Sequence, residues 1–200
     1  MAAPDRTASK PALALAERPA SLVQLMARKG KASALAAGVK AALGLDLPPP
    51  GKWAAGAGAD AIWIEPGGWL LMAEPAPPGA FRAKVAAAAG DLGAAVDQSS
   101  GRSVIRLEGA PARSVFATLC RLDLHPRVFG PGSAATTRVG HVTCTIRLVD
   151  ETPSFDLIVG STYARWLIEE LLEASHAHGA RLDRGPGGSG YARPAPGASP

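Results

Sequence analysis

Two cysteines and two histidines in the second half of the sequence have the types and spacing of a possible metal site. Cys120, His125, His141 and Cys144 follow the pattern C-x4-H and then H-x2-C, and tetrahedral zinc takes such ligands. The expected elements oppose this interpretation. Cys120 falls on the inward side of a helix, and His141 and Cys144, three positions apart on a strand, would point to opposite faces. We therefore predict two buried thiols, two unrelated histidines and no metal site.

Other catalytic and cofactor-binding patterns are missing from the sequence. No serine lies in a G-x-S-x-G elbow, and Cys120 has no cationic neighbour that the sequence guarantees. The stretch "GAGAD" in residues 56–60 lacks the full G-x-G-x-x-G spacing with its flanking strand and helix, and no Walker loop occurs. His176 and His178 lie at the exposed end of the last expected helix, where cations suit the negative end of the helix dipole. We predict no catalytic residue and no cofactor on this chain.

Arginines are concentrated in one part of a chain whose net charge is +4. Residues 101–150 contain seven arginines and three carboxylates. These arginines are Arg102, Arg106, Arg113, Arg121, Arg127, Arg138 and Arg147. The excess indicates either a docking face for an acidic partner or a phosphate, or arginines on a solvated surface. Nucleic acid is not expected, because aromatic residues make up only 5% of the chain and do not alternate with the arginines.

The apolar segments are too short or too interrupted for export or membrane insertion. Glu17 and Arg18 break the N-terminal stretch "ALALAERPASLVQLMARKG", so it lacks the apolar core of a signal peptide. No run approaches the ~20 apolar residues of a membrane helix. The two cysteines are too few for a disulfide framework. We expect a cytoplasmic protein with no membrane contact.

Helical and strand periodicities alternate along the chain, and the same order occurs twice. The expected strands are residues 21–27, 61–65, 69–74, 102–107, 134–149 (one bent strand, or two paired about Gly140) and 154–160, and the expected helices are 31–44, 79–90, 110–120 and 161–179. Each half runs strand, helix, strands and helix, as in a split βαβ unit. We predict an α+β fold of two ferredoxin-like halves, with antiparallel sheets that carry helices on one face.

The domain is expected to span residues 19–180. Residues 1–18 and 181–200, rich in Gly, Pro, Ala and Ser, are expected to form a mobile N-terminal tail and a disordered C-terminal tail. Within the domain, the first helix of each half leads into a Leu-Asp-Leu loop. The two loops are "GLDLPPPG" in residues 44–51 and "RLDLHPRVFGPG" in residues 121–132. Their similarity suggests a duplicated half-domain.

Several longer motifs resemble one family. They are "DQSSGR" in residues 97–102, "CRLDLHPRVFGPGS" in 120–133, "FDLIV" in 155–159 and "IEPGGWLLMAE" in 64–74. Over residues 21–179 the chain resembles the gamma subunit of heterotetrameric sarcosine oxidase. The resemblance implies a fold similar to the folate-binding domain of aminomethyltransferases, and a role as a partner subunit rather than a catalyst.

The same resemblance implies where the cofactors lie. In such complexes the beta subunit is expected to hold FAD and FMN and to oxidise sarcosine, the alpha subunit to bind NAD and tetrahydrofolate, and the delta subunit to carry zinc. This chain would be a non-catalytic accessory subunit of a complex that demethylates sarcosine to glycine and passes the one-carbon unit to tetrahydrofolate. Two alternatives stay open. One is a stand-alone folate-binding or one-carbon transfer protein, with Asp97 or Asp156 holding the pterin. The other is a gamma-like subunit of a demethylase for another N-methylated amine.

The candidate contacts with partner subunits are Arg102, His125, Arg127, Phe129 and Arg138. Pro126 and Pro131 restrict the backbone of residues 121–132, and Arg and Phe are favoured at interface centres. One hypothesis makes this loop a rigid docking element for the alpha subunit. The alternative is that the loop packs against its own sheet, with Asp123 capping a turn and Phe129 in the core.

Overall fold

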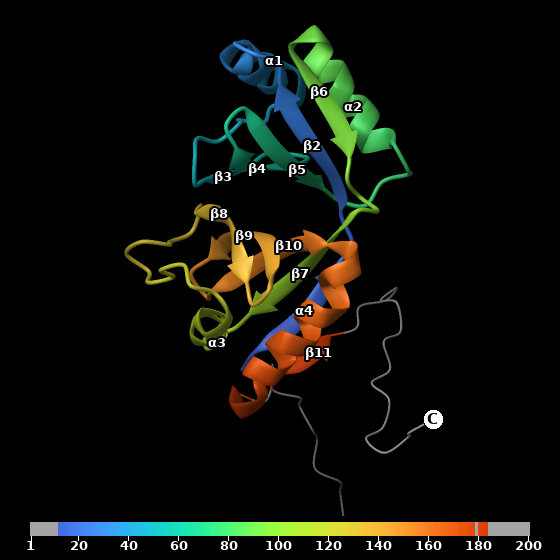
Figure 1. The fold of residues 1–200 in the computed structure, drawn as a ribbon. Coiled ribbons are helices and arrows are strands. Elements are labelled where there is room, and N and C mark those ends of the chain that lie inside the picture. Colours follow the sequence, from blue (N-terminus) through green and yellow to red (C-terminus); the bar gives the residue numbers. More distant parts are fainter. Residues whose placement is uncertain (1–11, 179, 184–200) are drawn as a thin grey trace, which may run out of the picture.

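The computed structural model describes residues 12–178 and 180–183, which form two stacked halves (Figure 1). The elements of the first half are β2 (Ser21–Ala27), α1 (Ala32–Leu43), β3 (Trp53–Ala55), β4 (Asp60–Glu65), β5 (Gly68–Ala73), α2 (Ala80–Ala89), η1 (Gly90–Leu92) and β6 (Gly93–Asp97). The elements of the second half are β1 (Ala14–Arg18), β7 (Arg102–Glu108), α3 (Ala112–Leu119), β8 (Ala134–Val139), β9 (Val142–Asp150), β10 (Ser154–Gly160), α4 (Ser161–Ala174), η2 (His176–His178) and β11 (Arg181–Asp183).

The sheet of the first half has the ferredoxin-like order. Its strands lie in the order β3-β4-β5-β2-β6, and every pairing is antiparallel. Helix α1 leads from β2 toward the β4–β5 hairpin, and α2 leads from β5 to β6, which is the β-α-β-β-α-β sequence of a split βαβ unit. The short strand β3 extends the edge next to β4.

The second sheet repeats this order with one addition. Its strands lie in the order β11-β1-β7-β10-β9-β8. Strands β7, β8, β9, β10 and β11 correspond to β2, β3, β4, β5 and β6, but β1 is inserted between β7 and β11. The two ferredoxin-like halves predicted from the sequence are therefore present, and the duplication extends to the extra edge strand of each half.

The predicted ends of the domain need a correction. Ala14–Arg18, assigned to the N-terminal tail, form β1 and pair with five residues of β7. Arg181–Asp183, assigned to the C-terminal tail, form β11 and pair in parallel with β1. Leu13 and Leu15 are fully buried, so the alternation of "LALAE" is that of a half-buried strand. The remaining tail predictions, residues 1–11 and 184–200, lie outside the described residues.

Each sheet has helices on one face and the other sheet on its opposite face. Figure 1 shows α1 and α2 at one end of the molecule, α3 and α4 at the other, and the two sheets between them. The inner faces of the sheets meet in an apolar layer. Its buried members are Leu22, Ile62, Leu70, Met72, Val104, Ala134 and Ile158. The fold is therefore a four-layer sandwich in which the two halves bury apolar surface against each other.

The helix-covered cores of the two halves differ in side-chain size. The second half buries Phe116, Phe129 and Phe155 under α3 and α4. The rings of Phe116 and Phe155 meet edge to face at 5.1 Å between centroids, and Phe129 stacks on Phe155 at 6.4 Å. The first half is filled mainly by Leu, Val and Ala, with Trp69 as its one buried aromatic ring in the described part of that core. The larger rings give the second half more apolar area to bury per residue.

Candidate functional site

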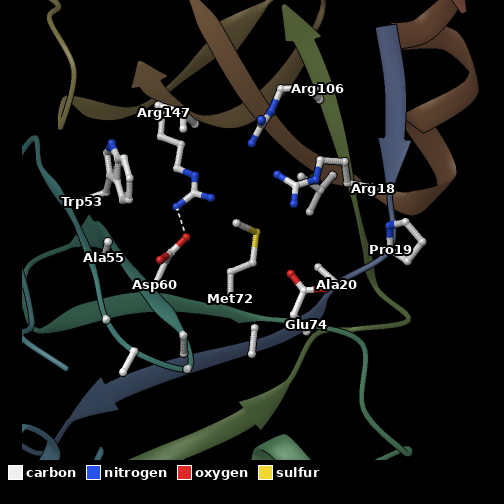
Figure 2. Close-up of a pocket in the computed structure, with 17 residues that line it drawn as sticks. Arg18, Pro19, Ala20, Trp53, Ala55, Asp60, Met72, Glu74, Arg106 and Arg147 are labelled. Atoms are coloured by element: carbon white, nitrogen blue, oxygen red, sulfur yellow. Dashed lines mark hydrogen bonds and ion pairs between the residues drawn. The ribbon is translucent and has the colours of Figure 1, made fainter. Parts of the chain in front are cut away.

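A cleft opens between the two sheets, beside the apolar layer that joins them. We call it the inter-sheet cleft; its volume is about 390 Å³. Its walls come from the end of β1, the β3–β4 hairpin, β5, β7 and β9. Figure 2 shows that the charged side chains Arg18, Asp60, Glu74, Arg106 and Arg147 surround it, with Trp53 at one end. Charged groups therefore gather at the junction of the two halves.

Three charged residues on neighbouring strands form the base of this site. Asp156 on β10 lies directly opposite Arg106 on β7 and Arg147 on β9. Residues opposite one another in antiparallel strands share a face of the sheet. Arg106 donates from Nε to Asp156 Oδ1 at 2.5 Å and from Nη2 to Oδ2 at 2.9 Å, and Arg147 donates from Nε to Oδ2 at 2.9 Å. The carboxylate is fully buried and shared by two guanidinium groups.

The ionisation of this cluster follows from its ion pairs. Burial by itself would raise the pKa of Asp156, but hydrogen bonds from Arg106 and Arg147 and their charges outweigh burial and hold that pKa below its usual value. Burial would likewise lower the pKa of Arg106, but its bond to Asp156 outweighs burial and raises the pKa. Asp156 and Arg106 therefore both stay charged at neutral pH. A carboxylate and guanidinium groups fixed in this way are poor at transferring protons.

Arg147 also connects the second half to the first. It donates from Nη1 to Asp60 Oδ2 on β4 at 2.6 Å, and its guanidinium carbon lies 4.4 Å from the ring centroid of Trp53 on β3. Trp53 in turn donates from Nε1 to the carbonyl oxygen of Leu148 on β9 at 2.8 Å. Arg147 is only 2% exposed. The network therefore stabilises the contact between the halves by charge, by a cation–π contact and by a hydrogen bond.

Backbone bonds reinforce this junction near the 121–132 loop. The amide of Trp53 donates to the carbonyl oxygen of Gly132 at 3.1 Å, and the amide of Ala134 donates to the carbonyl oxygen of Gly51 at 2.9 Å. Lys52 and Ser133 form an isolated antiparallel bridge at the same place. The ends of the two Leu-Asp-Leu loops thus pair with each other. The duplicated loops meet at the boundary between the halves.

The structure separates the arginines of residues 101–150 into two groups. Arg106 and Arg147 belong to the buried network, Arg113 donates to backbone carbonyls of the 121–132 loop, and Arg138 donates to the carbonyl oxygen of His141 at 3.0 Å. Within the described part of the chain, the remaining three have no side-chain partner. They are Arg102, Arg121 and Arg127. Arg106 and Arg147 therefore form neither a docking face nor a solvated surface; they stabilise the fold.

The predicted contact residues do not gather in one place. His125 and Arg127 are exposed neighbours on the 121–132 loop, where the amide of Arg127 donates to His125 Nδ1 at 3.2 Å. Arg138 is exposed on the edge strand β8. Arg102 lies on β7 opposite Gly160, and two strands, β10 and β9, separate β7 from β8 in the sheet. The exposed residues of the predicted contact set named so far therefore lie on the 121–132 loop and on β8.

Phe129 is a correction to the predicted contact set. Its side chain is only 5% exposed, stacks on Phe155 and belongs to the core of the second half. A ring buried in its own domain offers no surface to a partner. The alternative given for the loop, with Phe129 in the core, describes this side chain correctly, and the Asp123 carboxylate does cap a turn by accepting from the amide of His125 at 2.9 Å.

The cysteines and histidines are separated by burial. Cys120 and Cys144 are free and buried, and burial raises the pKa of the Cys144 thiol to about 12. His125 and His141 are exposed. Among residues 12–178 and 180–183, no group of three or more His, Cys, Asp or Glu side chains is placed to hold a metal ion. None of the described helices is long and apolar enough to cross a membrane.

The sequence pattern around Asp156 and Arg147 indicates a buried charged network that was not predicted above. Asp156 and Arg147 each stand inside a strand of otherwise apolar residues, "FDLIV" and "TIRLV". A charge in such a strand needs a partner of opposite sign, because burying it alone costs several kcal/mol. The pairing of β9 with β10 brings the two together. The role of Asp60 had no such signal, because it depends on how the two sheets stack.

Comparison with known proteins identifies the family. Residues 28–177 match the model of the "Sarcosine oxidase, gamma subunit family". The chain belongs to this family. It is 33% identical over 155 residues to a sarcosine oxidase subunit gamma of Arthrobacter sp., covering 75% of this chain and 76% of the relative. It is also 33% identical over 148 residues to the corresponding subunit of Corynebacterium sp. (strain U-96), covering 70% and 71%.

Solved structures agree with the family and with the fold. A chain of the heterotetrameric sarcosine oxidase from Corynebacterium sp. U-96 in complex with pyrrole 2-carboxylate matches with a TM-score of 0.74 and 29% identity, covering 87% of this chain and 89% of that chain. Glycine cleavage system aminomethyltransferase T from Bartonella henselae matches with a TM-score of 0.67 and 17% identity, covering 86% and 48%. The latter shows a common fold, as the sequence resemblance implied.

Proposed function

We propose that this chain is the non-catalytic accessory subunit of a heterotetrameric sarcosine oxidase. The observation that carries the proposal is the match to a chain of the Corynebacterium enzyme, which covers nearly nine-tenths of both chains. Coverage of this extent supports a role as a subunit of that type. The complex would oxidise sarcosine to glycine with oxygen as acceptor, and would pass the one-carbon unit to tetrahydrofolate.

In this proposal the chemistry belongs to the partner subunits. The beta subunit would hold FAD and FMN, the alpha subunit NAD and tetrahydrofolate, and the delta subunit zinc, all in the cytoplasm. The charged cluster beside the inter-sheet cleft supports this division, because two arginines hold the buried carboxylate of Asp156 and keep its pKa below the usual value, which makes it a poor proton carrier. The charged residues around the cleft connect the two halves of this chain.

The stand-alone folate-binding alternative loses its two proposed carboxylates. Asp156 is fully buried and accepts hydrogen bonds from both Arg106 and Arg147. Asp97 lies at the end of β6, where its carboxylate accepts a hydrogen bond from the amide of Ser99 at 2.9 Å. It does not line the inter-sheet cleft. A pterin in the cleft would therefore need one of the carboxylates that line it, Asp60 or Glu74, and Asp60 already pairs with Arg147.

Co-purification tests the proposal. The tagged chain would be expressed together with the genes that neighbour its own, and the eluted material examined by absorbance and for sarcosine-dependent peroxide formation. We expect a yellow complex that produces peroxide with sarcosine. A colourless chain that elutes alone from every co-expression would overturn the proposal.

Two further assays separate the alternatives. Calorimetric titration of the purified chain with tetrahydrofolate should release no heat, whereas a saturable signal would favour the folate-binding protein. A panel of N-methylated amines tested on the yellow complex should show sarcosine as the preferred substrate. A preference for a different amine would keep the subunit role and change the substrate.

A further inference from the structure

We infer that the 121–132 loop is a preorganised docking surface for an acidic, partly apolar patch on a neighbouring subunit. The inference rests on the proposed function, because it names the surface by which the chain joins the complex. Its basis is the contrast between how firmly the loop is held from beneath and what it presents outward. The segment that contains it, between α3 and β8, leaves the body of the second half on the side away from α4 (Figure 1).

The loop is fixed to its own domain at two places and is stiffened by a turn of its own. Arg113 on α3 donates from Nη1 to the carbonyl oxygens of Leu124 and of Phe129, the latter at 3.0 Å. The Phe129 ring is buried against Phe155. The amides of Val128 and Phe129 both donate to the carbonyl oxygen of His125, at 2.8 and 2.9 Å, which closes a tight turn. A loop held in this way loses little conformational entropy when a partner binds.

The outer surface of the same turn is exposed and unpaired. Val128 is 61% exposed, the largest fraction among the large apolar side chains of the described residues. It stands next to Arg127, which is exposed and has no side-chain partner within residues 12–178 and 180–183. Arg121 at the start of the loop is likewise exposed and has no side-chain partner among the described residues. An apolar side chain beside unpaired guanidinium groups fits a surface with carboxylates around an apolar centre.

The corresponding loop of the first half lacks these features. In residues 44–51 the only charged side chain, Asp46, pairs with Lys40 at 2.7 Å. Its remaining residues are leucines, prolines and glycines, and none of them is a large exposed apolar side chain. Two loops in equivalent positions therefore differ in the exposed residues, although both pack against their own halves. Such a difference in exposed residues is expected if only the 121–132 loop binds a partner.

A pair of matched double variants tests the inference in the full complex. Arg127→Glu with Val128→Asp reverses the charge and removes the apolar contact at the tip of the loop. The control, Arg28→Glu with Val96→Asp, makes the same changes at exposed positions of the first half, where Val96 is 42% exposed. Neither pair touches the buried network. Circular dichroism and thermal unfolding establish that both variants are folded.

The expected result is a loss of at least about tenfold in affinity for the partner subunits with the loop variant, and less than about twofold with the control. Raising the salt concentration should weaken the wild-type complex and reduce the difference in affinity between the wild type and the loop variant. If a folded loop variant assembles as the wild type does while the wild type forms the flavin complex, the docking surface is wrong and the subunit role stands. If the wild type joins no complex, both the proposed function and this inference are wrong.

Discussion

The two halves of the molecule share their strand order but differ in what they bury. The first half has alanine-rich helices and a core of Leu, Val and Ala around Trp69. The second half has a cluster of three phenylalanines, an extra strand inserted in its sheet and a loop between α3 and β8 that is longer than the loop between α1 and β3. A duplicated connectivity can therefore persist while the packing and the surface of the two copies diverge.

The Leu-Asp-Leu loops show how far the divergence goes. In the first loop Leu45 is buried and Leu47 only partly buried, whereas in the second Leu122 is partly buried and Leu124 is buried. Asp46 pairs with a lysine side chain, but Asp123 caps a backbone turn. The same three letters thus differ in burial and in hydrogen-bond or ion-pair partners. The likeness of the loops in sequence does not extend to the contacts they make.

The largest expected effect tests the difference between the loops in core packing. Phe129→Ala should lower the free energy of unfolding by about 3 to 5 kcal/mol, because it leaves a cavity beside Phe155. Leu47→Ala in the first loop should lower it by only about 1 kcal/mol, because that side chain is partly exposed. Urea denaturation of the purified chain measures both. Equal losses would contradict the assignment of Phe129 to the core.

The next effect tests the network between the halves. Asp156→Asn should cost about 3 kcal/mol, because it leaves the buried guanidinium of Arg147 without its carboxylate at Asp156. The control Glu169→Gln breaks the exposed pair between Arg165 and Glu169 and should change stability by less than about 0.5 kcal/mol. The same unfolding assay compares them. A small effect of Asp156→Asn would mean that the network contributes little to joining the halves.

A smaller effect tests how the second loop is held. Arg113→Met keeps the apolar stem of the side chain and removes the donor to the carbonyls of Leu124 and Phe129, so it should cost about 1 to 3 kcal/mol. Lys84→Met on the exposed face of α2 serves as the control and should lie within about 0.5 kcal/mol of the wild type. Amide exchange should also become faster in the 121–132 loop. Unchanged exchange there would show that the loop does not need Arg113.

The pH dependence gives the smallest expected signal. The ion pairs of Asp156 lower its pKa in the folded state, so its contribution to stability is present above its unfolded value, near pH 3.8, and is lost as the pH falls further. Wild-type protein should therefore lose more unfolding free energy on acidification below about pH 4 than Asp156→Asn does. Chemical denaturation over a pH series measures the difference. Parallel curves for the two proteins would contradict a lowered pKa.

The sequence was sufficient for the four α-helices, for most of the strands and for the family, but it predicted none of β1, β3, β6 and β11 and no contacts between distant strands. The hairpin around Gly67, the turn at Gly140 and the amphipathic helix α4 follow from local patterns of apolar residues and glycines. The insertion of β1 beside β7 depends on pairing across more than eighty residues, which no local pattern contains.

The same limit applies to the candidate site. The burial of Asp156 and Arg147 could have been inferred from charges inside apolar strands, but Asp60 and Trp53 join them only because the two sheets stack. For the 121–132 loop, sequence reasoning left docking and core packing as rival interpretations. The structure shows that Phe129 packs in the core and that the side chains of Arg127 and Val128 are exposed.

Native mass spectrometry of the complex purified through this chain tests the central claim most directly. The account predicts one copy of this chain bound to larger subunits that carry flavin, and it predicts that the complex loses this chain when Arg127→Glu and Val128→Asp are combined. Detection of the chain only as a free monomer, or in assemblies without flavin under conditions where the neighbouring gene products are present and folded, would contradict the claim that it is a sarcosine oxidase subunit.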